Sequence, residues 1–275
     1  MYDIAATIVT YKNDIKTLQK TIDSFLNTDL DVMLYIVDNS PSDEIGDICK
    51  NGKIKHIFNG KNVGFGAGHN IAIREMVGRT KYFLILNPDV YFDKGVLEKL
   101  FSFMEKDKTV GSVMPKVLYP DGSLQYLCRL LPTPSDLVLR KFNNKYLSSL
   151  TNLITKYELR FADYTKIMDV PYLSGCFMFV RIDVFEKIGM FDERFFLYFE
   201  DIDLSRRIHK LYRTVYYPET VIYHGYERGS DKDIGHFKDI VSSATKYFNK
   251  WGYFFDKERK TINNKTLRNL SHVPG

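Results

Sequence analysis

The sequence has few cysteines and no long apolar stretch. Its three cysteines, Cys49, Cys128 and Cys176, lie far apart and form neither a CxxC pair nor a disulfide framework, so we expect a reducing compartment. The amino-terminal residues lack the basic and apolar regions of a signal peptide. The longest apolar runs, over 83–86 and 173–180, fall well short of the roughly 20 residues of a membrane-spanning helix. We therefore expect a cytoplasmic protein whose contact with the inner face of the membrane, if any, is peripheral.

Several common catalytic signatures are also missing. The Walker A, HExxH and GxSxG patterns do not occur, which excludes the reaction classes that depend on them. The glycine-rich stretch that begins at Gly64 is not a GxGxxG fingerprint, because His69 stands where the third glycine would be. It also follows the second strand–helix unit rather than the first. A nicotinamide-dependent dehydrogenase is therefore disfavoured.

The charge balance is only mildly basic. Lys and Arg together number 39 and Asp and Glu 34, which gives a net charge of +5 and a pI near 8.8. This balance is too weak to indicate nucleic acid, and it is compatible with anionic substrates or an anionic membrane face. Aromatic residues make up 15% of the chain, which is typical of a packed core plus ring-lined surfaces for a flat ligand or a lipid boundary. The length of 275 residues suits one large domain.

Strand and helix signals alternate through the first third of the chain. Apolar and β-branched runs predict strands over 4–10, 33–37, 53–58 and 82–86, and helical spacing predicts helices over 14–27 and 70–76. Further on we expect strand and turn over 111–126, one buried strand over 170–181, and helices within 184–188 and 191–207. This order predicts an α/β fold with a mostly parallel sheet covered by helices on both faces.

Four polar motifs follow strands or lie between them, so they would meet at one rim of the sheet, where such folds bind ligands. They are Thr10-Tyr11, Asp38-Asn39, the glycine loop over 62–70, and Asn87-Pro88-Asp89. Asp38 could accept a hydrogen bond from the ring imide of uracil or thymine, with Thr10 and Tyr11 on the same edge. Taken alone, Asp38 is better explained as a turn-forming residue. The glycine loop lets a ligand approach the backbone and leads into a helix N-terminus.

Two further positions are candidates for metal binding. Asp89 lies on a turn after an apolar strand, where it could hold a hard divalent cation that stabilises a diphosphate as a leaving group. Its alternative role is to cap the turn and the following helix. His224 also follows an apolar strand, and it is either a structural residue or a further metal ligand or phosphate donor.

A cluster of acids marks a second candidate region. Glu200, Asp201 and Asp203 open a predicted helix behind an aromatic run. They complement the helix dipole, but three carboxylates within four positions exceed what a cap requires. Crowding and an apolar wall would raise the pKa of one carboxylate and suit it to general-base work. Arg206 and Arg207 would balance the charge.

Residues 129–168 form a distinct segment. Apolar residues at three- and four-residue steps alternate with basic ones, which predicts a basic amphipathic helix that either packs as a lid or lies on a membrane. A membrane contact would also draw on the basic residues near the C-terminus, Lys257, Arg259, Lys260, Lys265 and Arg268.

The motifs taken together resemble a known family. In order, IVTYKN, IVDNSPSD, NVGFGAGHN, LILNPDV, LSGCFMFVR, FDERFFLYFEDIDLSRR and VIYHG are similar to the inverting glycosyltransferases of family 2, in particular the rhamnosyltransferase-like branch that builds bacterial surface and cell-wall polysaccharides. The resemblance covers about residues 3–250. It implies a Rossmann-like GT-A fold, a dTDP- or UDP-sugar donor, Mg²⁺ or Mn²⁺, and a saccharide or lipid-linked acceptor.

The resemblance also implies roles for single residues. Those that match the family's nucleotide-binding positions are Thr10, Tyr11, Asp38, Asn62, Gly66 and Asn70. Asn87-Pro88-Asp89 stands where the family has a DxD motif, with Asn87 in place of the first Asp, so the grip on the metal rests mainly on Asp89. In the Glu200-Asp201 pair, Asp201 matches the catalytic base, and His224 matches a position that completes the metal site.

The expected reaction is a single in-line displacement in which Asp201 deprotonates an acceptor hydroxyl. We expect a glycosyltransferase domain over 1–250, with a nucleotide-binding half over 1–110 and an acceptor and catalytic half over 111–250 that carries the helical insertion 129–168. Residues 251–275 would be a basic C-terminal tail. Two other functions are open: a sugar nucleotidyltransferase, although residues 10–13 offer no glycine-rich basic loop, and a non-catalytic module that binds sugar nucleotides.

Overall fold

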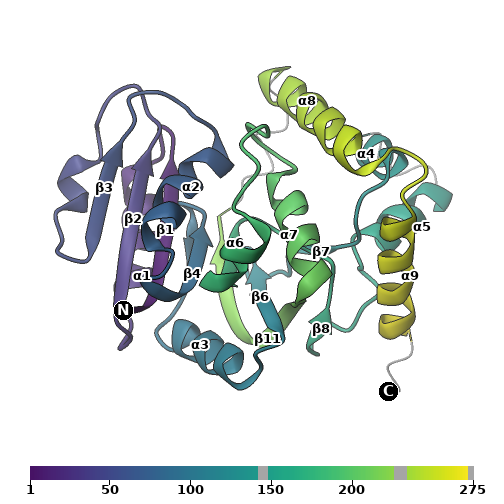
Figure 1. The fold of residues 1–275 in the computed structure, drawn as a ribbon, viewed down its shortest axis with the longest axis horizontal. Helices are drawn as coiled ribbons and strands as arrows, with labels where there is room; N and C mark the ends of the chain where they lie inside the picture. The colour runs from purple at the N-terminus through teal and green to yellow at the C-terminus, as the bar shows by residue number, and fades with distance from the viewer. Residues whose placement is uncertain (142–147, 226–233, 272–275) are drawn as a thin grey trace.

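The computed structural model describes residues 1–141, 148–225 and 234–271. Within them, a nine-stranded sheet has the order β3-β2-β1-β4-β10-β6-β11-β5, and β8 pairs with β11 beside this path (Figure 1). The strands are β1 (Tyr2–Thr10), β2 (Val32–Asp38), β3 (Ile54–Phe58), β4 (Thr80–Leu86), β5 (Val90–Tyr91), β6 (Val110–Leu118), β8 (Met168–Asp169), β10 (Phe177–Arg181) and β11 (Arg213–His224). The predicted α/β fold is confirmed.

Helices cover both faces of the sheet because the strand residues alternate between them. Ile4, Ala6 and Ile8 of β1 belong to the core under α1 (Ile15–Leu26) and α3 (Val96–Lys106). Ala5, between them, faces the opposite core, which contains residues of α2 (Phe65–Met76), α6 (Ile182–Ile188) and α7 (Glu200–Leu211). The short 3-10 helix η1 (Gly46–Cys49) precedes β3. Both faces of the central strands are thus dry, as the continuous apolar runs predict.

The sheet is parallel only in part. Strands β3, β2, β1 and β4 are parallel neighbours, whereas β10 is antiparallel to both β4 and β6. Strand β11 is then parallel to β6. The carboxyl ends of β1, β2, β4, β6 and β11 therefore point to the same edge, and the loops that follow them gather there.

The single strand expected over 170–181 is divided in two. Its first part, β9 (Tyr172–Leu173), leaves the main sheet and pairs with β7 (Cys128–Arg129), while β10 stays in the sheet. Residues 174–176 join the two parts at the functional edge. The division has a physical reason at Gly175, whose N–H donates to the Asp201 side chain instead of to a neighbouring strand, whereas the Cys176 carbonyl still accepts from Asn87 N–H next to the β4–β10 pair.

The segment 129–168 is not one helix. It contains α4 (Pro134–Lys141) and α5 (Ser148–Tyr157). Residues 142–147, which belong to the predicted amphipathic helix, lie outside the described residues. The end of the segment packs onto the core: Ile154, Tyr157 and Leu159 are buried, and the Leu130 N–H donates to the Tyr157 carbonyl at 3.0 Å. Of the two alternatives for this segment, packing against the protein therefore applies to its second half.

Residues 251–271, the described part of the predicted basic tail, are largely helical and pack on the fold. Helix α8 (Ile234–Trp251) is followed by α9 (Lys257–Ser271), and both lie with α4 and α5 on the side of the molecule away from β3 (Figure 1). Asp256, between them, pairs with Arg206 of α7, and Arg259 and Thr266 are buried. No helix within the described residues has the length and apolarity that crossing a membrane requires.

Candidate active site

Asp38, at the end of β2, is a buried carboxylate with one oxygen engaged and one idle. Thr10, its neighbour on β1, donates its hydroxyl to Asp38 Oδ1 at 3.0 Å, and the Ser40 N–H donates to the same oxygen at 2.9 Å. Asp38 is only 1% exposed, and its Oδ2 has no hydrogen-bond partner within the described chain. A buried acceptor without a donor is costly, so this oxygen is suited to a ligand N–H. Tyr11, next to Thr10, is half exposed.

The glycine loop that follows β3 packs against the loop before α7. The Phe65 N–H donates to the Phe196 carbonyl at 2.9 Å, and a Cβ on Gly64, whose φ is +93°, would lie 2.5 Å from the same oxygen. Asn62 caps the turn by accepting from the Gly64 N–H at 3.0 Å. Only glycine fits at position 64, so this contact fixes the loop against the chain around Phe196.

Gly66 and Asn70, which were predicted to lie beside a nucleotide, are used to hold α2 against the same loop. A Cβ on Gly66 would lie 2.9 Å from Cβ of Phe191. The Asn70 side chain accepts from the Phe191 N–H at 3.0 Å and donates to the Phe191 carbonyl and to Glu193. Their contact with a nucleotide stays a prediction, and the structure gives both residues a packing role.

Asn87, Asp89 and His224 meet at the end of β4 and β11. His224 Nε2 lies 3.4 Å from Asp89 Oδ1 and 3.4 Å from Asn87 Nδ2. Backbone contacts hold the group together, because the Gly225 N–H donates to the Asp89 carbonyl at 3.0 Å and Asn87 N–H donates to the Cys176 carbonyl at 2.9 Å. The sequence placed these residues on separate strands, and the antiparallel pair formed by β5 and β11 brings them side by side.

Gln125, which the sequence analysis did not select, determines how His224 presents its ring. Gln125 Nε2 donates to the His224 carbonyl at 2.8 Å, so its other amide atom, Oε1, is the acceptor that lies 3.0 Å from His224 Nδ1. This arrangement places the imidazole proton on Nδ1 and leaves the lone pair of Nε2 directed toward Asn87 and Asp89. Fixing a ring nitrogen by hydrogen-bonding the other one is what metal-binding histidines require.

The donor set fits a divalent cation. Two possible ligand atoms, Asp89 Oδ1 and His224 Nε2, converge, and the 3.4 Å between them is close to the spacing of about 3 Å expected for adjacent ligands on one ion. The Asn87 amide directs its nitrogen toward His224, so it contributes a hydrogen-bond donor and not a ligand. A second acidic group lies apart from it: Asp38, Asp43 and His56 are the one cluster of three or more His, Cys, Asp or Glu residues with closely spaced ligand atoms in the described part of the chain. Because it includes Asp38, it belongs to the predicted nucleoside end of the site.

Asp201 opens α7 as a carboxylate held by three donors. Its Oδ2 accepts from the Tyr172 hydroxyl and from the Gly175 N–H, both at 2.9 Å, and its Oδ1 accepts from the Ile202 N–H at 2.8 Å. Burial raises the pKa of Asp201 above its usual value, while these hydrogen bonds oppose the shift. The carboxylate is therefore a stronger base than a free aspartate and is held in a fixed orientation.

Glu200, directly before Asp201, is the member of this pair whose charged form is disfavoured more strongly. It is buried, its Oε2 has no hydrogen-bond partner in the described chain, and burial together with the charge of Asp201 raises its pKa well above the usual value. The two residues before it, Tyr198 and Phe199, both have φ of +68°, a strained conformation that turns the chain sharply into α7. Because Asp201 has three donors and Glu200 lacks a partner for Oε2, the negative charge of the pair resides on Asp201.

A short stretch of backbone connects the two acidic centres. Within residues 174–176, the Gly175 N–H donates to Asp201, and the Cys176 carbonyl accepts from the Asn87 N–H. A Cβ on Gly175 would lie 3.0 Å from Cβ of Asp201, so glycine permits this approach. Both Asp89 and Asp201 are close enough to Cys176 to raise the pKa of its buried thiol further, after the larger effect of burial. Asp89 and Asp201 thus lie at the same edge of the molecule, on either side of Cys176.

The expectation that Arg206 and Arg207 balance the charge of Glu200, Asp201 and Asp203 holds for Arg207 and is wrong for Arg206. Arg206 donates to both carboxylate oxygens of Asp256, at 2.6 and 2.8 Å, and to Glu258. Arg207 pairs with Asp203 at 2.8 Å. Arg206 and Arg207 lie five and six positions beyond Asp201, which places them on other sides of the helix: Arg206 faces Asp256 and Glu258, and Arg207 faces the carbonyls of Ile188, Gly189 and Met190.

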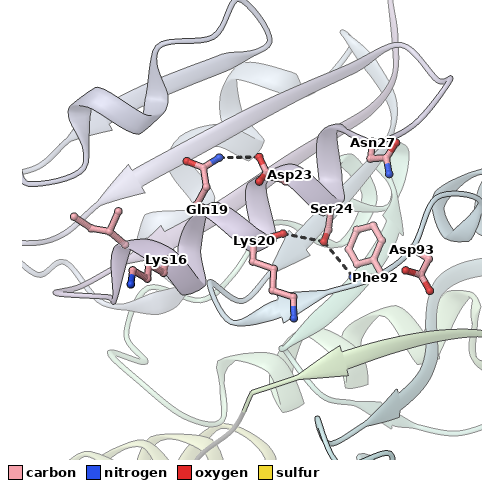
Figure 2. Close-up of a pocket in the computed structure, with 9 residues that line it drawn as sticks. Lys16, Gln19, Lys20, Asp23, Ser24, Asn27, Phe92 and Asp93 are labelled. Carbon is pink, nitrogen blue, oxygen red and sulfur yellow. Dashed lines mark hydrogen bonds between the residues drawn. The ribbon is translucent and has the colours of Figure 1, made fainter.

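An open hollow on the outer side of α1 lies apart from these residues. Figure 2 shows that it is lined by polar side chains of α1 and by Phe92 and Asp93, which follow β5. Gln19 donates to Asp23 at 2.7 Å and the Phe92 N–H to Ser24 at 3.3 Å. It contains none of the predicted site residues.

Comparison with known proteins identifies the family of the chain. Residues 6–189 match the family model described as glycosyl transferase family 2. The hexosyltransferase Agl10 of low-salt glycan biosynthesis from Haloferax volcanii is 28% identical over 209 residues, which cover 74% of this chain and 61% of that protein. The N-acetylglucosaminyl-diphospho-decaprenol L-rhamnosyltransferase of Mycobacterium tuberculosis is 26% identical over 76% of this chain and 71% of its own length. The rhamnosyltransferase WbbL of Escherichia coli is 25% identical, over 70% and 71%.

A solved structure supports the fold. GalNAc-T7, crystallised with UDP, GalNAc and Mn²⁺, superposes with a TM-score of 0.67 over 94% of this chain and 50% of its own, at 15% identity. At this identity the likeness concerns the fold, which is GT-A. The chain spans about three fifths of Agl10 and half of GalNAc-T7.

Proposed function

The chain belongs to glycosyl transferase family 2, and from this premise we propose that it transfers a sugar from a nucleoside-diphosphate sugar to a hydroxyl of a saccharide, with inversion at the anomeric carbon. The observation that carries the proposal is the link between the two acidic centres through residues 174–176. It sets a fixed base, Asp201, beside a group suited to a diphosphate, Asn87 with Asp89 and His224. An inverting transfer needs this arrangement, because attack and departure occur together on opposite sides of one carbon.

In the proposed reaction each residue acts on a defined atom. Asp201 accepts the proton of the acceptor hydroxyl as that oxygen bonds to the anomeric carbon, and the bond from that carbon to the phosphate oxygen breaks with its electron pair on the diphosphate. Tyr172 and Gly175 keep Asp201 oriented. Asp38 binds the imide N–H of a uracil or thymine ring with its idle oxygen. A divalent ion held by Asp89 and His224 would stabilise the charge of the departing diphosphate.

The proposal also specifies which ion and which sugar the protein uses. The imidazole of His224 favours Mn²⁺ over Mg²⁺, because Mg²⁺ prefers an all-oxygen shell. Two relatives bear the name rhamnosyltransferase, and one of them acts by name on a diphospho-decaprenol acceptor. We therefore propose dTDP-rhamnose as the first donor to test, ahead of UDP-sugars, and a lipid-linked saccharide as the acceptor.

The experiment that tests the function compares Asp201→Asn with the wild type. We expect Asp201→Asn to lower turnover by a factor of at least about 100, because a neutral amide cannot take the proton, while donor affinity measured by calorimetry stays within a few-fold. Asp29→Asn, which removes an exposed acid far from the edge, serves as the control. Near-normal turnover of Asp201→Asn would remove this residue from its role. If the wild type and both variants bind the donor without turnover, the result would favour the non-catalytic module. Release of pyrophosphate from a nucleoside triphosphate would favour the nucleotidyltransferase.

A peripheral membrane contact fits a lipid-linked acceptor. The turn between α8 and α9, which lies outside the basic segment 129–168, supports such a contact. Phe254 and Phe255, between α8 and α9, are 78% and 97% exposed, and Lys257 and Lys260 follow them. Exposed aromatic residues beside basic ones suit the interface of an anionic membrane. Flotation with anionic vesicles is expected to carry the wild type upward and to leave a Phe254→Ser, Phe255→Ser variant behind. Equal behaviour of the two proteins would exclude this turn as the contact.

A further inference from the structure

Arg129 is a cation beside the candidate site whose side chain has neither a hydrogen-bond partner nor an ion-pair partner in the described chain. It lies on β7 directly opposite Tyr172 of β9, with its guanidinium carbon 5.8 Å from the centre of the Tyr172 ring. Its Nε is buried without a hydrogen bond, and no hydrogen bond or ion pair links its side chain to any described residue. Tyr172 in turn donates to Asp201. Arg129 is thus one residue removed from the proposed base.

This state is unusual within the molecule. Each of the other buried or half-buried arginines with a described side chain donates at least two hydrogen bonds, namely Arg181, Arg206, Arg207, Arg213 and Arg259. A guanidinium has five donors and no acceptor, so leaving it partly desolvated and unpaired carries a penalty that the fold avoids at those five positions.

The surroundings keep Arg129 charged without satisfying it. Burial opposes the charge, but nearby groups, which include the carboxylates of Glu158 and Asp201, outweigh it and raise the pKa of Arg129. Glu158 is itself engaged by Arg160, at 2.7 Å. Asp201 is held by its own three donors. The remaining way to satisfy this cation is an anion that arrives with a ligand.

We propose that Arg129 binds a phosphate group of the acceptor, next to the sugar whose hydroxyl Asp201 deprotonates. The contacts run in the order Arg129, Tyr172, Asp201, residues 174–176 and Asn87, so Arg129 lies at the opposite end from the group assigned to the donor's diphosphate. A phosphate at Arg129 is therefore a second anion. An acceptor saccharide joined to a lipid through a phosphate or diphosphate places such an anion one pyranose ring away from the attacking hydroxyl. This inference rests on the proposed function.

Binding tests the inference without turnover. The probe is decyl diphosphate, with decyl glucoside as the uncharged comparison, titrated into the full chain by calorimetry in EDTA so that no divalent ion supports binding near Asp89. We expect Arg129→Gln to weaken diphosphate binding about 10- to 100-fold, as loss of a charge-assisted contact does, and to leave the glucoside unchanged. Arg129→Lys should retain part of the affinity. Arg268→Gln, an exposed arginine of α9, should match the wild type.

Stability separates a binding role from a structural one. Because the Arg129 side chain makes no hydrogen bond with the described chain, Arg129→Gln is expected to keep or raise the melting temperature. Equal binding of the probe by Arg129→Gln and wild type would overturn the proposal, and so would a large loss of stability with equal losses for both probes.

Turnover then identifies the source of the phosphate. With a phosphorylated and an unphosphorylated form of one acceptor, Arg129→Gln should raise KM only for the phosphorylated form. A rise in the donor KM instead would assign Arg129 to the donor and overturn its assignment to the acceptor. If the wild type transfers no sugar from any donor, the proposed function fails, while the binding result still stands for or against the anion site.

Discussion

Replacing Tyr172 by Phe removes one of the three donors that hold Asp201 and leaves the ring in place. The hydroxyl donates to Asp201 Oδ2 at 2.9 Å, and burial together with the charge of Asp201 raises the pKa of Tyr172 well above its usual value, so the hydroxyl stays protonated throughout any practical assay range. It therefore favours the charged form of Asp201 at every pH tested. A hydrogen bond to a charged group contributes about 1.5 to 3 kcal/mol, which corresponds to roughly one to two pK units.

The sign of the effect follows from these contacts. Burial raises the pKa of Asp201, and the Tyr172 hydroxyl is one of the groups that hold it down. Without that hydroxyl the pKa rises further, so the acid limb of the kcat profile moves to higher pH, by about one unit if half of the bond energy is recovered from water. Well above the limb, Asp201 is ionised in both proteins, and turnover should differ by only a few-fold.

The assay is nucleoside-diphosphate release measured at saturating donor and acceptor from pH 5 to 9. Tyr217→Phe is the matched control, because Tyr217 is also a buried tyrosine with a carboxylate partner, Glu219, but lies away from Asp201. An acid limb that stays in place, or moves to lower pH, would refute the assignment of Tyr172 as a donor to an ionised base. A uniform loss of kcat at all pH values would indicate that Tyr172 positions Asp201 without setting its pKa.

The remaining predictions concern Glu200, the His224 ring held by Gln125, and the ion pair between Arg206 and Asp256. Glu200→Gln should leave the melting temperature unchanged below about pH 4 and raise it increasingly above that pH, because the raised pKa of Glu200 makes wild-type stability fall as pH rises; parallel curves would contradict this. Gln125→Leu should weaken Mn²⁺-dependent donor binding about 10- to 100-fold in calorimetry by releasing the His224 ring, and unchanged affinity would exclude that role. Arg206→Met should lower the free energy of unfolding in urea by about 3 kcal/mol, since it removes the bidentate partner of buried Asp256 and leaves that carboxylate only the 4.0 Å ion pair and the backbone N–H of Arg259, and a loss under about 1 kcal/mol would count against the pair.

Local patterns were sufficient where an element is long and its environment uniform. The runs over 4–10 and 82–86 are apolar on both faces because helices cover both sides of β1 and β4, so their strands could be read directly from the sequence. The same runs located Asp38 and Asp89, since a polar residue directly after a buried strand must lie at the sheet edge. The order of motifs then indicated the family.

Contacts between distant segments were not accessible in this way. Gln125 meets His224 across 99 positions, and nothing in its local sequence distinguishes it from other polar turn residues. Tyr172 and Arg129 face each other through two strands of two residues each, which are too short for any periodicity to show. The break at 174–176 was missed because the residues on both sides are apolar, as in a continuous strand. These features depend on how distant strands pair with one another, and a single sequence does not reveal that pairing.

Helix α7 has consequences beyond the residues it presents. Its first turn carries Asp201, whereas Asp203 is bound by Trp251 and Lys250 of α8, and Arg206 is clamped by Asp256 at the start of α9. The proposed proton acceptor therefore lies in a helix that residues 250–256 hold in place through its first two turns. A bilayer or a protein that binds or displaces α8 and α9 is thus expected to shift Asp201 and to change the rate of the proposed reaction.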